Sequence, residues 1–430
     1  MRSSRLTISV LFTIAIMIVS QSCDSRLNID EPKRLYKLIG NDGNQGAVDI
    51  VTDASDFIYI LGTSTSTSDG IQLYVVKTDQ KGIVLWEKTF GDPGDETGKD
   101  IELTASGDLV IAADRTDIST GEKDFVIYTV KADDGSVIGT PVTGGYPGTA
   151  DFVSGITQIA DGFIVAAFSD KGTFKSGSVF RYDANMVPVP TWGSDISQYI
   201  NNIDGFDFIP VKVIQINTDL FYTFCYTNST INGDAVSEYN FFIYVSNQFN
   251  DFKNVLVLPG LSDNSNERLT SVRAVPVQSG GGFVLGGYVS TSGNGQELYV
   301  VRVRQDLEFV DQSDTGGFLQ GLPKAVTDKL SSVNNSNATV YPSKNSGFLV
   351  LGNQNTTGND DIFLTKVDNA LNNSWDQPHA FGGEGDDNAG AVAETSDGRI
   401  LVCGTMVLGR AIGQRKIVLM NLNPIGKFDE

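Results

Sequence analysis

Two short strand-like phrases recur seven times along the chain, and this repetition restricts the fold more than any other feature of the sequence. The first phrase is an apolar run that usually ends in a small residue, at positions Gly62, Ala113, Ala167, Cys225, Gly287, Gly352 and Gly404. The second is an alternating run that usually ends in a basic residue, at Lys77, Lys131, Arg181, Ser246, Arg302, Lys366 and Asn421. Because the two markers stay in phase, they indicate seven tandem units.

Each unit has the length expected of one propeller blade. The first unit predicts strands near residues 47–52, 57–63, 73–78 and 83–90, with turn residues between them. Four strands of about six residues plus their turns fill roughly 50 residues. Tandem sandwich domains would need units of about 100 residues, and a parallel β-helix has shorter coils. We therefore predict an all-β fold, a seven-bladed β-propeller of four-stranded blades.

The two ends of the chain predict how the ring closes. The phrase "KRLYKLIG" (residues 33–40) has no preceding partner and resembles the outer strand "VLWEKTFG" of the next unit, whereas the last unit ends early at "IGKFDE". An N-terminal strand that completes the last blade would remove an unpaired sheet edge. Units seven, one and two then become neighbours, and this explains why "FGDPGDETGKD" (residues 90–100) and "FGGEGDDNAGA" (residues 381–391) are so similar.

The N-terminus has the features of a lipoprotein signal peptide over residues 1–22. Arg2 and Arg5 precede an apolar run over residues 6–19. This run is shorter than the roughly 20 residues of a membrane span. The end of this segment, Ser22-Cys23, resembles a bacterial lipobox. The resemblance implies that cleavage precedes Cys23 and that its thiol carries lipid, with 23–32 as a linker and 33–430 as the propeller. An ordinary secreted protein is the alternative.

The net charge and the cysteine content indicate which partners and which cellular location to expect. The formal net charge of −21 repels nucleic acid and anionic membrane surfaces, so we expect no nucleic-acid partner. Cys225 and Cys403 lie in apolar strand phrases of different units, which predicts two buried free thiols. The expected location is the bacterial cell envelope, with the protein lipid-anchored in the outer membrane, either periplasmic or surface-exposed.

The repeats also resemble a known group of proteins. Trp86, Phe90, Gly91, Gly94, Asp95 and Glu96 follow the pattern W-x3-F-G-x-x-G-D-[DE], and residues 381–387 follow most of it. This pattern resembles the propeller repeats of bacterial envelope lipoproteins, and "DQKGIVLW" is distantly similar to quinoprotein-like propellers. The resemblance implies fold and location rather than an activity.

No residue pattern for catalysis stands out, so we predict no catalytic residue and no enzyme. His379 is the single histidine and lies where an outer strand is expected, so it is interpreted as a surface residue. Neither a CxxC pair nor a phosphate-binding glycine loop is present. Carboxylates close to the propeller axis would allow the alternative function, a secreted carbohydrate-active enzyme (a glycoside hydrolase or lyase).

The strongest functional lead is an acidic arc on three neighbouring turns. The aligned turns of units seven, one and two place Asp42, Asp95, Glu96, Asp386 and Asp387 along one face. Such acids commonly accept hydrogen bonds from turn N–H groups. The second interpretation is a binding site for calcium or for a cationic ligand. No cofactor is predicted otherwise, and the identity of any metal is left open.

Together these features predict a non-enzymatic, lipid-anchored β-propeller that is attached to the membrane through Cys23 and binds a protein or glycan on one face. A close pair of carboxylates in an axial pocket would favour the enzyme, whereas scattered rim acids would favour binding.

Overall fold

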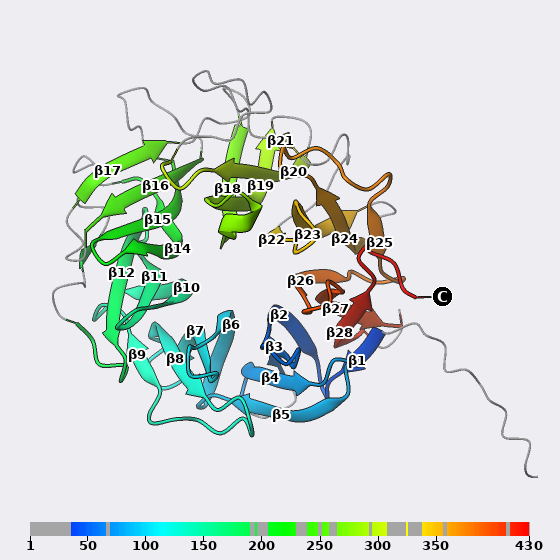
Figure 1. The fold of residues 1–430 in the computed structure, drawn as a ribbon. Helices are drawn as coiled ribbons and strands as arrows, with labels where there is room; N and C mark the ends of the chain where they lie inside the picture. The colour runs from blue at the N-terminus through cyan, green and yellow to red at the C-terminus, as the bar shows by residue number, and fades with distance from the viewer. Residues whose placement is uncertain are drawn as a thin grey trace, which may run out of the picture.

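The computed structural model describes residues 36–65, 69–189, 194–195, 205–228, 239–247, 252–257, 265–291, 295–307, 324–325, 338–355, 359–409 and 413–429. Seven four-stranded antiparallel sheets form a ring, so the prediction of a seven-bladed β-propeller is confirmed (Figure 1). The signal peptide 1–22, Cys23 and the linker 23–32 lie outside the described residues.

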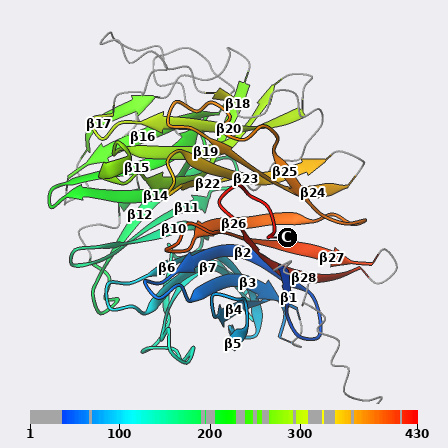
Figure 2. The same ribbon diagram turned by 45° about the vertical axis from the view of Figure 1, so that its right-hand side comes forward.

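The blades follow one another in chain order, each running from the centre of the ring outwards (Figures 1 and 2). Blade 1 contains β2 (Gln45–Thr52), β3 (Ile58–Ser64), β4 (Gln72–Thr78) and β5 (Val84–Phe90). Blade 2 contains β6 (Gly94–Leu103), β7 (Leu109–Asp117), β8 (Lys123–Val130) and β9 (Val142–Gly144). Blade 3 contains β10 (Ala150–Ile159), β11 (Gly162–Asp170), β12 (Lys175–Asp183) and β13 (Ser194–Asp195).

The remaining blades repeat this order. Blade 4 contains β14 (Phe208–Asn217), β15 (Leu220–Thr227), β16 (Asn240–Ser246) and β17 (Phe252–Val257). Blade 5 contains β18 (Ser265–Ala274), β19 (Phe283–Thr291), β20 (Gly295–Val303) and β21 (Lys324–Ala325), with a 3-10 turn at Val277–Ser279. Blade 6 contains β22 (Thr339–Pro342), β23 (Phe348–Asn355), β24 (Asp360–Val367) and β25 (His379–Phe381), and blade 7 contains β26 (Asn388–Glu394), β27 (Ile400–Leu408) and β28 (Gln414–Leu422).

The two ends of the chain close the ring as predicted. Strand β1 (Tyr36–Ile39) is the outer strand of blade 7 and pairs antiparallel with β28, with Tyr36 opposite Met420 and Ile39 opposite Ile417. Ile39 is buried in the hydrophobic cluster between blades 7 and 1. The N-terminal strand therefore protects the edge of β28 and joins the first and last units of the sequence.

The hydrophobic cores lie between adjacent blades, which explains why several strands are apolar throughout. One cluster, for example, packs Leu61 and Val75 of blade 1 against Ile111 and Ala113 of blade 2. Aromatic residues of blade 4 contribute to these cores, and the buried ones are Phe208, Phe221, Tyr222, Phe224, Phe241 and Phe242. Cys225 and Cys403 are buried free thiols, as predicted, and burial raises the pKa of Cys403 to about 12.

Basic residues of the repeat connect neighbouring blades at one end of the ring. Lys77 Nζ donates to the carbonyl oxygen of Ala132 in the next blade at 3.0 Å, and Arg302 donates to that of Asn369 in the equivalent turn, also at 3.0 Å. Asn421 fills the same position in blade 7 and donates to the carbonyl of Gln80 at 3.0 Å. In these three blades the second sequence marker is therefore an interblade contact, whereas Arg181 pairs with Asp161 and Lys366 donates to Ser343 within their own blades.

A β-bulge recurs in the innermost strands and determines what reaches the axis. In six of the seven inner strands the pairing register shifts by one residue near the middle. The residues that follow the bulges are Asp49, Asp100, Gly155, Lys212, Ser271 and Ala391. Because a bulge redirects side chains, the same position of each blade forms one layer around the axis.

Candidate functional site

The predicted acidic turns lie at the end of the ring where the inner strands begin. We call this end, formed by turns such as residues 40–44, 91–93 and 382–387, the entry face. In five of the seven blades, one side chain at this turn or at the start of the inner strand accepts a hydrogen bond from a backbone N–H of the preceding blade: Asn44 from Arg415, Asp95 from Ile71, Asp207 from Lys175, Asn266 from Tyr239, and Asp386 from Asp360. These contacts span 2.8 to 3.2 Å and join neighbouring blades.

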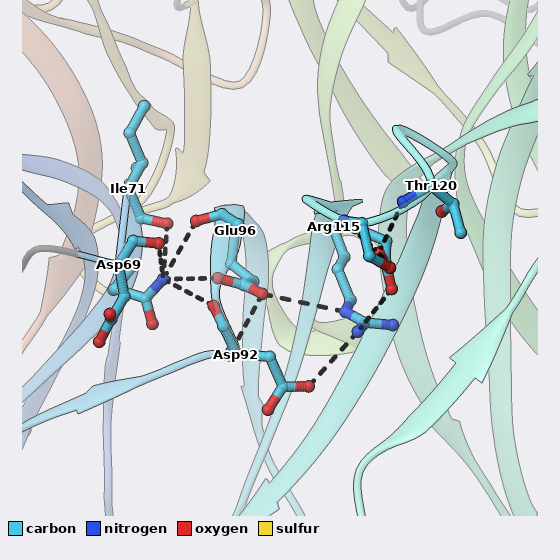
Figure 3. A network of polar contacts seen from close by, with 10 residues as sticks. Asp69, Ile71, Asp92, Glu96, Arg115 and Thr120 are labelled. Atoms are coloured by element: carbon cyan, nitrogen blue, oxygen red, sulfur yellow. Dashed lines mark hydrogen bonds and ion pairs between the residues drawn. The ribbon is translucent and has the colours of Figure 1, made fainter.

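Glu96 follows Asp95 and is fully buried in the contact between blades 1 and 2, where several polar contacts converge (Figure 3). Its carboxylate accepts from Gln72 Nε2 at 2.9 Å and from the backbone N–H of Asp92 at 3.2 Å, and Arg115 lies 4.0 Å away. Burial raises the pKa of Glu96 to about 7. Arg115 also pairs with Asp92 at 3.4 Å and with Asp117 at 3.5 Å.

Asp387 occupies the position of Glu96 in blade 7, and it is also fully buried. Its carboxylate accepts from the backbone N–H groups of Gly383 at 2.6 Å and Val407 at 2.7 Å. Burial raises its pKa. In blade 1 this position is Gln45, which accepts from Lys416 Nζ at 2.8 Å. The repeat thus uses Glu, Asp and Gln for one purpose, to accept hydrogen bonds from polar groups at the turn that begins each of these three blades.

The five residues of the predicted arc therefore divide into two groups. Asp42, Asp95 and Asp386 are exposed at the entry face, whereas Glu96 and Asp387 are buried and hydrogen-bonded. Asp42 stands two residues before the hydrogen-bonding residue of its own blade, Asn44. Among the described residues, no group of three or more His, Cys, Asp and Glu side chains is placed to hold a metal ion. Ligand binding by the arc stays a prediction.

The centre of the ring contains two cavities, and their lining residues were not predicted from the sequence. The upper axial cavity, about 320 Å³, lies toward the entry face and is lined by residues such as Ala47, Gly98, Thr270 and Gly390. The lower axial cavity, about 380 Å³, is lined by residues further along the same strands, including Val51, Leu103 and Ile214. Asp100, Lys212 and Arg273 line both cavities, so a charged layer separates them.

Lys212 is the centre of this layer and is fully bonded. Its Nζ atom contacts Asp100 Oδ2 and Glu102 Oε1, each at 2.6 Å, and the carbonyl oxygen of Ile156 at 2.7 Å. These three partners use the three hydrogens of an ammonium group. Burial opposes the charge of Lys212, but Asp100 and Glu102 outweigh it and raise its pKa.

Gly155 allows this contact to cross blade 3. Lys212 belongs to blade 4 and its carboxylate partners belong to blade 2, so the ammonium must pass the inner strand β10. A Cβ atom at Gly155 would lie 2.7 Å from the carbonyl oxygen of Val211 and 3.2 Å from both Lys212 Cδ and Asp100 Oδ2. A glycine at this position therefore provides the space for the ion pair.

Asp49 and Arg273 form a second, looser pair within the same layer. Arg273 Nη2 lies 3.7 Å from Asp49 Oδ1, and Asp49 also accepts from its neighbour Ile50 N at 2.8 Å. Burial raises the pKa of Asp49 to about 7 despite the nearby Arg273. Burial also opposes the charge of Asp100, but Lys212 and Arg273 outweigh it and lower the pKa of Asp100. Two axial carboxylates thus have pKa values shifted in opposite directions.

The sequence contains a signal for two of these residues. Asp49 and Asp100 stand at the same offset in the aligned turns and strands of units one and two, four residues after Gln45 and Glu96. The bulge that brings them to the axis has no sequence marker of its own. Lys212 comes from unit four, where both repeat markers depart from the usual residues, with Cys225 and Ser246 in their places.

His379 lies where it was predicted, on the outer strand β25. The ring is half-buried against Trp375, with centroids 5.0 Å apart, and Nε2 lies 3.1 Å from the carbonyl oxygen of Ile425. These contacts support a packing role for His379. It lies on the outermost strand of blade 6, which is separated from the inner strand β22 by β23 and β24.

No family model and no curated protein matches the sequence. Several solved structures are distantly similar. An α-L-arabinofuranosidase from Fusarium graminearum, in complex with an iminosugar inhibitor, has a TM-score of 0.46 and 8% identity, covering 91% of this chain and 97% of that one. The β-propeller domain of the Trilobed protease from Pyrococcus furiosus has a TM-score of 0.45 and 9% identity, with coverage of 88% and 93%. The Dos1 propeller has a TM-score of 0.42 and 13% identity, with coverage of 89% and 80%.

The chain therefore resembles known propeller structures in fold, and the similarity is distant. The part of the chain that the structure describes has no helix with the length and apolar character needed to cross a membrane.

Proposed function

We propose that the protein is a non-enzymatic, lipid-anchored β-propeller of the bacterial cell envelope, which binds a protein or glycan partner at its entry face. The observation that carries the proposal is the arrangement of the acidic turns. Buried members such as Glu96 and Asp387 stabilise these turns through hydrogen bonds, while Asp42, Asp95, Glu384 and Asp386 are exposed on the same turns. A rigid rim that displays carboxylates on neighbouring loops suits recognition of a basic or hydroxyl-rich surface.

The path of the chain supports the choice of face. Strand β1 begins at Tyr36 and leads directly into the turn that carries Asp42, so the chain enters the ring from the end opposite the entry face. In this proposal a lipid on Cys23 attaches the protein on the side where β1 begins, opposite the entry face. The acidic turns would then be directed away from the site of attachment, toward a partner.

The anchor is tested by Cys23→Ala in the producing bacterium. The wild-type protein is expected in the membrane fraction and in the detergent phase of a Triton X-114 separation, and the variant in the aqueous phase. Metabolic labelling with a fatty-acid analogue checks the modification directly. An unlabelled wild-type protein in the aqueous phase would support ordinary secretion instead.

The binding role is tested by a glycan array and by a parallel assay for released reducing ends. We expect binding without hydrolysis, and at least tenfold weaker binding by the double variant Asp42→Lys, Glu384→Lys, because both side chains are exposed. The matched control Lys253→Glu changes an exposed charge on the outer strand β17 and should bind normally. If the array is negative, the same variants are compared in crosslinking to envelope proteins.

One observation favours the second candidate, a carbohydrate-active enzyme. Asp49 and Asp100 line a real axial cavity and differ in pKa in the way that an acid and an ionised partner of a glycosidase do. Against this, Asp100 is held by Lys212 at 2.6 Å and by the N–H of Ile156 at 2.8 Å, which restrains it as a structural ion. Hydrolysis of an array glycan that Asp49→Asn abolishes would overturn the binding proposal in favour of this one.

A further inference from the structure

The lower axial cavity combines apolar walls with a charged end. Its apolar lining includes Val51, Ile101, Leu103, Ile214 and Ala393. At the charged end, Lys212 is neutralised by Asp100 and Glu102. The remaining cation is Arg273, which lies at the boundary with the upper cavity and retains 28% side-chain exposure. Because Arg273 lines both cavities, this exposure is directed toward the axis rather than toward the outer surface.

Arg273 differs from Lys212 in how completely its donors are used. A guanidinium has five N–H donors arranged as a planar fork. Within the described residues, the Arg273 group makes one hydrogen bond, a long one of 3.4 Å from Nη1 to the carbonyl oxygen of Val272, and one ion pair of 3.7 Å with Asp49. Lys212, in the same layer, has three contacts of 2.6 to 2.7 Å. Of these two axial cations, Arg273 therefore has more N–H donors available to a ligand.

A second polar group, the hydroxyl of Thr157, belongs to a residue that lines the lower cavity. The Thr157 hydroxyl is buried, and no described residue forms a hydrogen bond with it. Thr157 lines the same cavity as Arg273. An unsatisfied buried hydroxyl costs free energy, and a bound polar group would remove this cost. Two independent features of one cavity thus call for a hydrogen-bonding ligand.

The geometry points to a binding site in the lower axial cavity for a small monocarboxylic acid with an apolar body, with its carboxylate on Arg273 and its body against the apolar walls. A carboxylate matches the guanidinium fork and forms two parallel hydrogen bonds with it. The apolar part loses water-exposed surface in the cavity. The site is separate from the acidic turns of the entry face and does not depend on their function.

Asp49 competes with such a ligand for Arg273. The ionised Asp49 carboxylate pairs with the guanidinium, and the protonated form releases it. Because the pKa of Asp49 is about 7, the competition changes in the neutral range. Binding of the acid should therefore strengthen as the pH falls from 8 to 6, while the ligand itself stays ionised.

Other charged and titratable groups around this pair come from four strands. They are Asp100 and Glu102 on β6, Lys212 on β14, Tyr341 on β22 and Cys403 on β27. Lys212 pairs with both Asp100 and Glu102 and, together with Arg273, lowers the pKa of Asp100, and burial keeps the pKa values of Tyr341 and Cys403 above their ordinary values. Asp49 is therefore the member of this set that titrates between pH 6 and 8.

The test uses sodium benzoate and its uncharged analogue benzamide, measured by isothermal titration calorimetry on the mature chain at pH 6. Benzoate is expected to bind at least tenfold more tightly than benzamide, with a negative heat-capacity change from apolar burial. Hexanoate, compared with hexanamide, extends the test to an aliphatic body. Equal affinity for acid and amide, or no heat from either acid at about 10 mM, would overturn the proposal.

Variants locate the site. Arg273→Gln should weaken benzoate binding at least tenfold, and Arg273→Lys should weaken it as well, because a lysine keeps the charge but loses the planar fork. Arg415→Gln, which removes an exposed arginine, is the matched control and should bind normally. Arg273→Lys also keeps a cation beside Asp49, so it remains informative if Arg273→Gln fails to fold. Unchanged binding by a folded Arg273 variant would place the ligand elsewhere.

Asp49→Asn separates this site from a nonspecific apolar pocket. Removing the competing carboxylate should raise benzoate affinity at pH 8 and abolish its dependence on pH between 6 and 8. A nonspecific pocket would show no difference between Asp49→Asn and the wild type. That outcome, or a variant that loses affinity at pH 8, would contradict the role given to Arg273.

Discussion

The entry-face turns and the axial charged layer both contain buried carboxylates, but they use them differently. At the rim, Glu96 and Asp387 accept hydrogen bonds from side-chain and backbone donors of adjacent segments, and the arrangement recurs from blade to blade. At the axis, Asp100 pairs with a lysine two blades away, and Asp49 lies beside an arginine from blade 5. The rim therefore follows the repeat, whereas the axis breaks it.

The difference indicates where stability and specificity reside. A contact that recurs in several blades holds the ring together and says little about a ligand. A layer that contains Asp, Gly, Lys, Ser and Ala at equivalent positions has no such common purpose. Substitutions can test this distinction, because the axial ions should show large charge-dependent effects and the rim residues small hydrogen-bond effects.

The largest effect is expected from Lys212→Met. The substitution leaves Asp100 and Glu102 beside each other without their shared cation, and it removes the donor to the Ile156 carbonyl. Loss of one partner of a buried ion pair costs about 3 to 5 kcal/mol in the free energy of unfolding. Urea denaturation would measure this cost.

Two controls sharpen this prediction. Lys253→Met removes an exposed lysine and should change the stability by less than about 0.5 kcal/mol. Adding Asp100→Asn to Lys212→Met should restore part of the lost stability, because it removes one uncompensated charge. If the double variant is no more stable than Lys212→Met, charge is not the main cause of the loss.

The second-largest expected effect is a dependence of the free energy of unfolding on pH. Asp49 has a folded-state pKa of about 7 against an ordinary value of 3.8, so the folded protein holds a proton that the unfolded chain has lost between these values. The free energy of unfolding should therefore fall as the pH rises from about 4 to 7, by up to about 1.4 kcal/mol per pH unit. Asp49→Asn should flatten this slope in urea denaturation at pH 5, 6 and 7.

Glu96 shifts in the same direction, so the wild-type slope contains both contributions. Glu96→Gln should remove only its own share, and the two substitutions together should remove more than either alone. A slope in Asp49→Asn equal to that of the wild type would mean that Asp49 is ionised in the folded protein throughout this range.

At the rim, Glu96→Ala should cost about 1 to 3 kcal/mol in the free energy of unfolding. The substitution leaves the Gln72 amide and the Asp92 N–H without their acceptor in a buried position. Glu96→Gln should cost less, since blade 1 already has Gln45 at this position. Equal losses for the two variants, measured by thermal and urea denaturation, would show that the carboxylate charge matters here as it does at the axis.

The sequence allowed prediction of the ring but not of its centre. Repeat spacing and turn residues predicted the blades, and the unmatched N-terminal phrase predicted the pairing of β1 with β28, because these depend on local patterns and on edge protection. The contact between Lys212 and Asp100 depends on a bulge in each inner strand and on the missing side chain of Gly155, which are features of three-dimensional packing. The alignment of turns likewise grouped Asp42 with Asp95, although Asn44 makes the equivalent contact.

The smallest expected effect is the difference between substitutions of Asp95 and of Asp42. Asp95→Ala removes the acceptor for the Ile71 N–H at 2.9 Å and should cost about 0.5 to 1.5 kcal/mol, whereas Asp42→Ala should stay within about 0.5 kcal/mol because its side chain is exposed. Asp95→Asn keeps the acceptor and should resemble the wild type. If Asp42→Ala proves as destabilising as Asp95→Ala in urea denaturation, the exposed rim acids also support the fold. Asp42 would then have a structural role and would not be available to a partner.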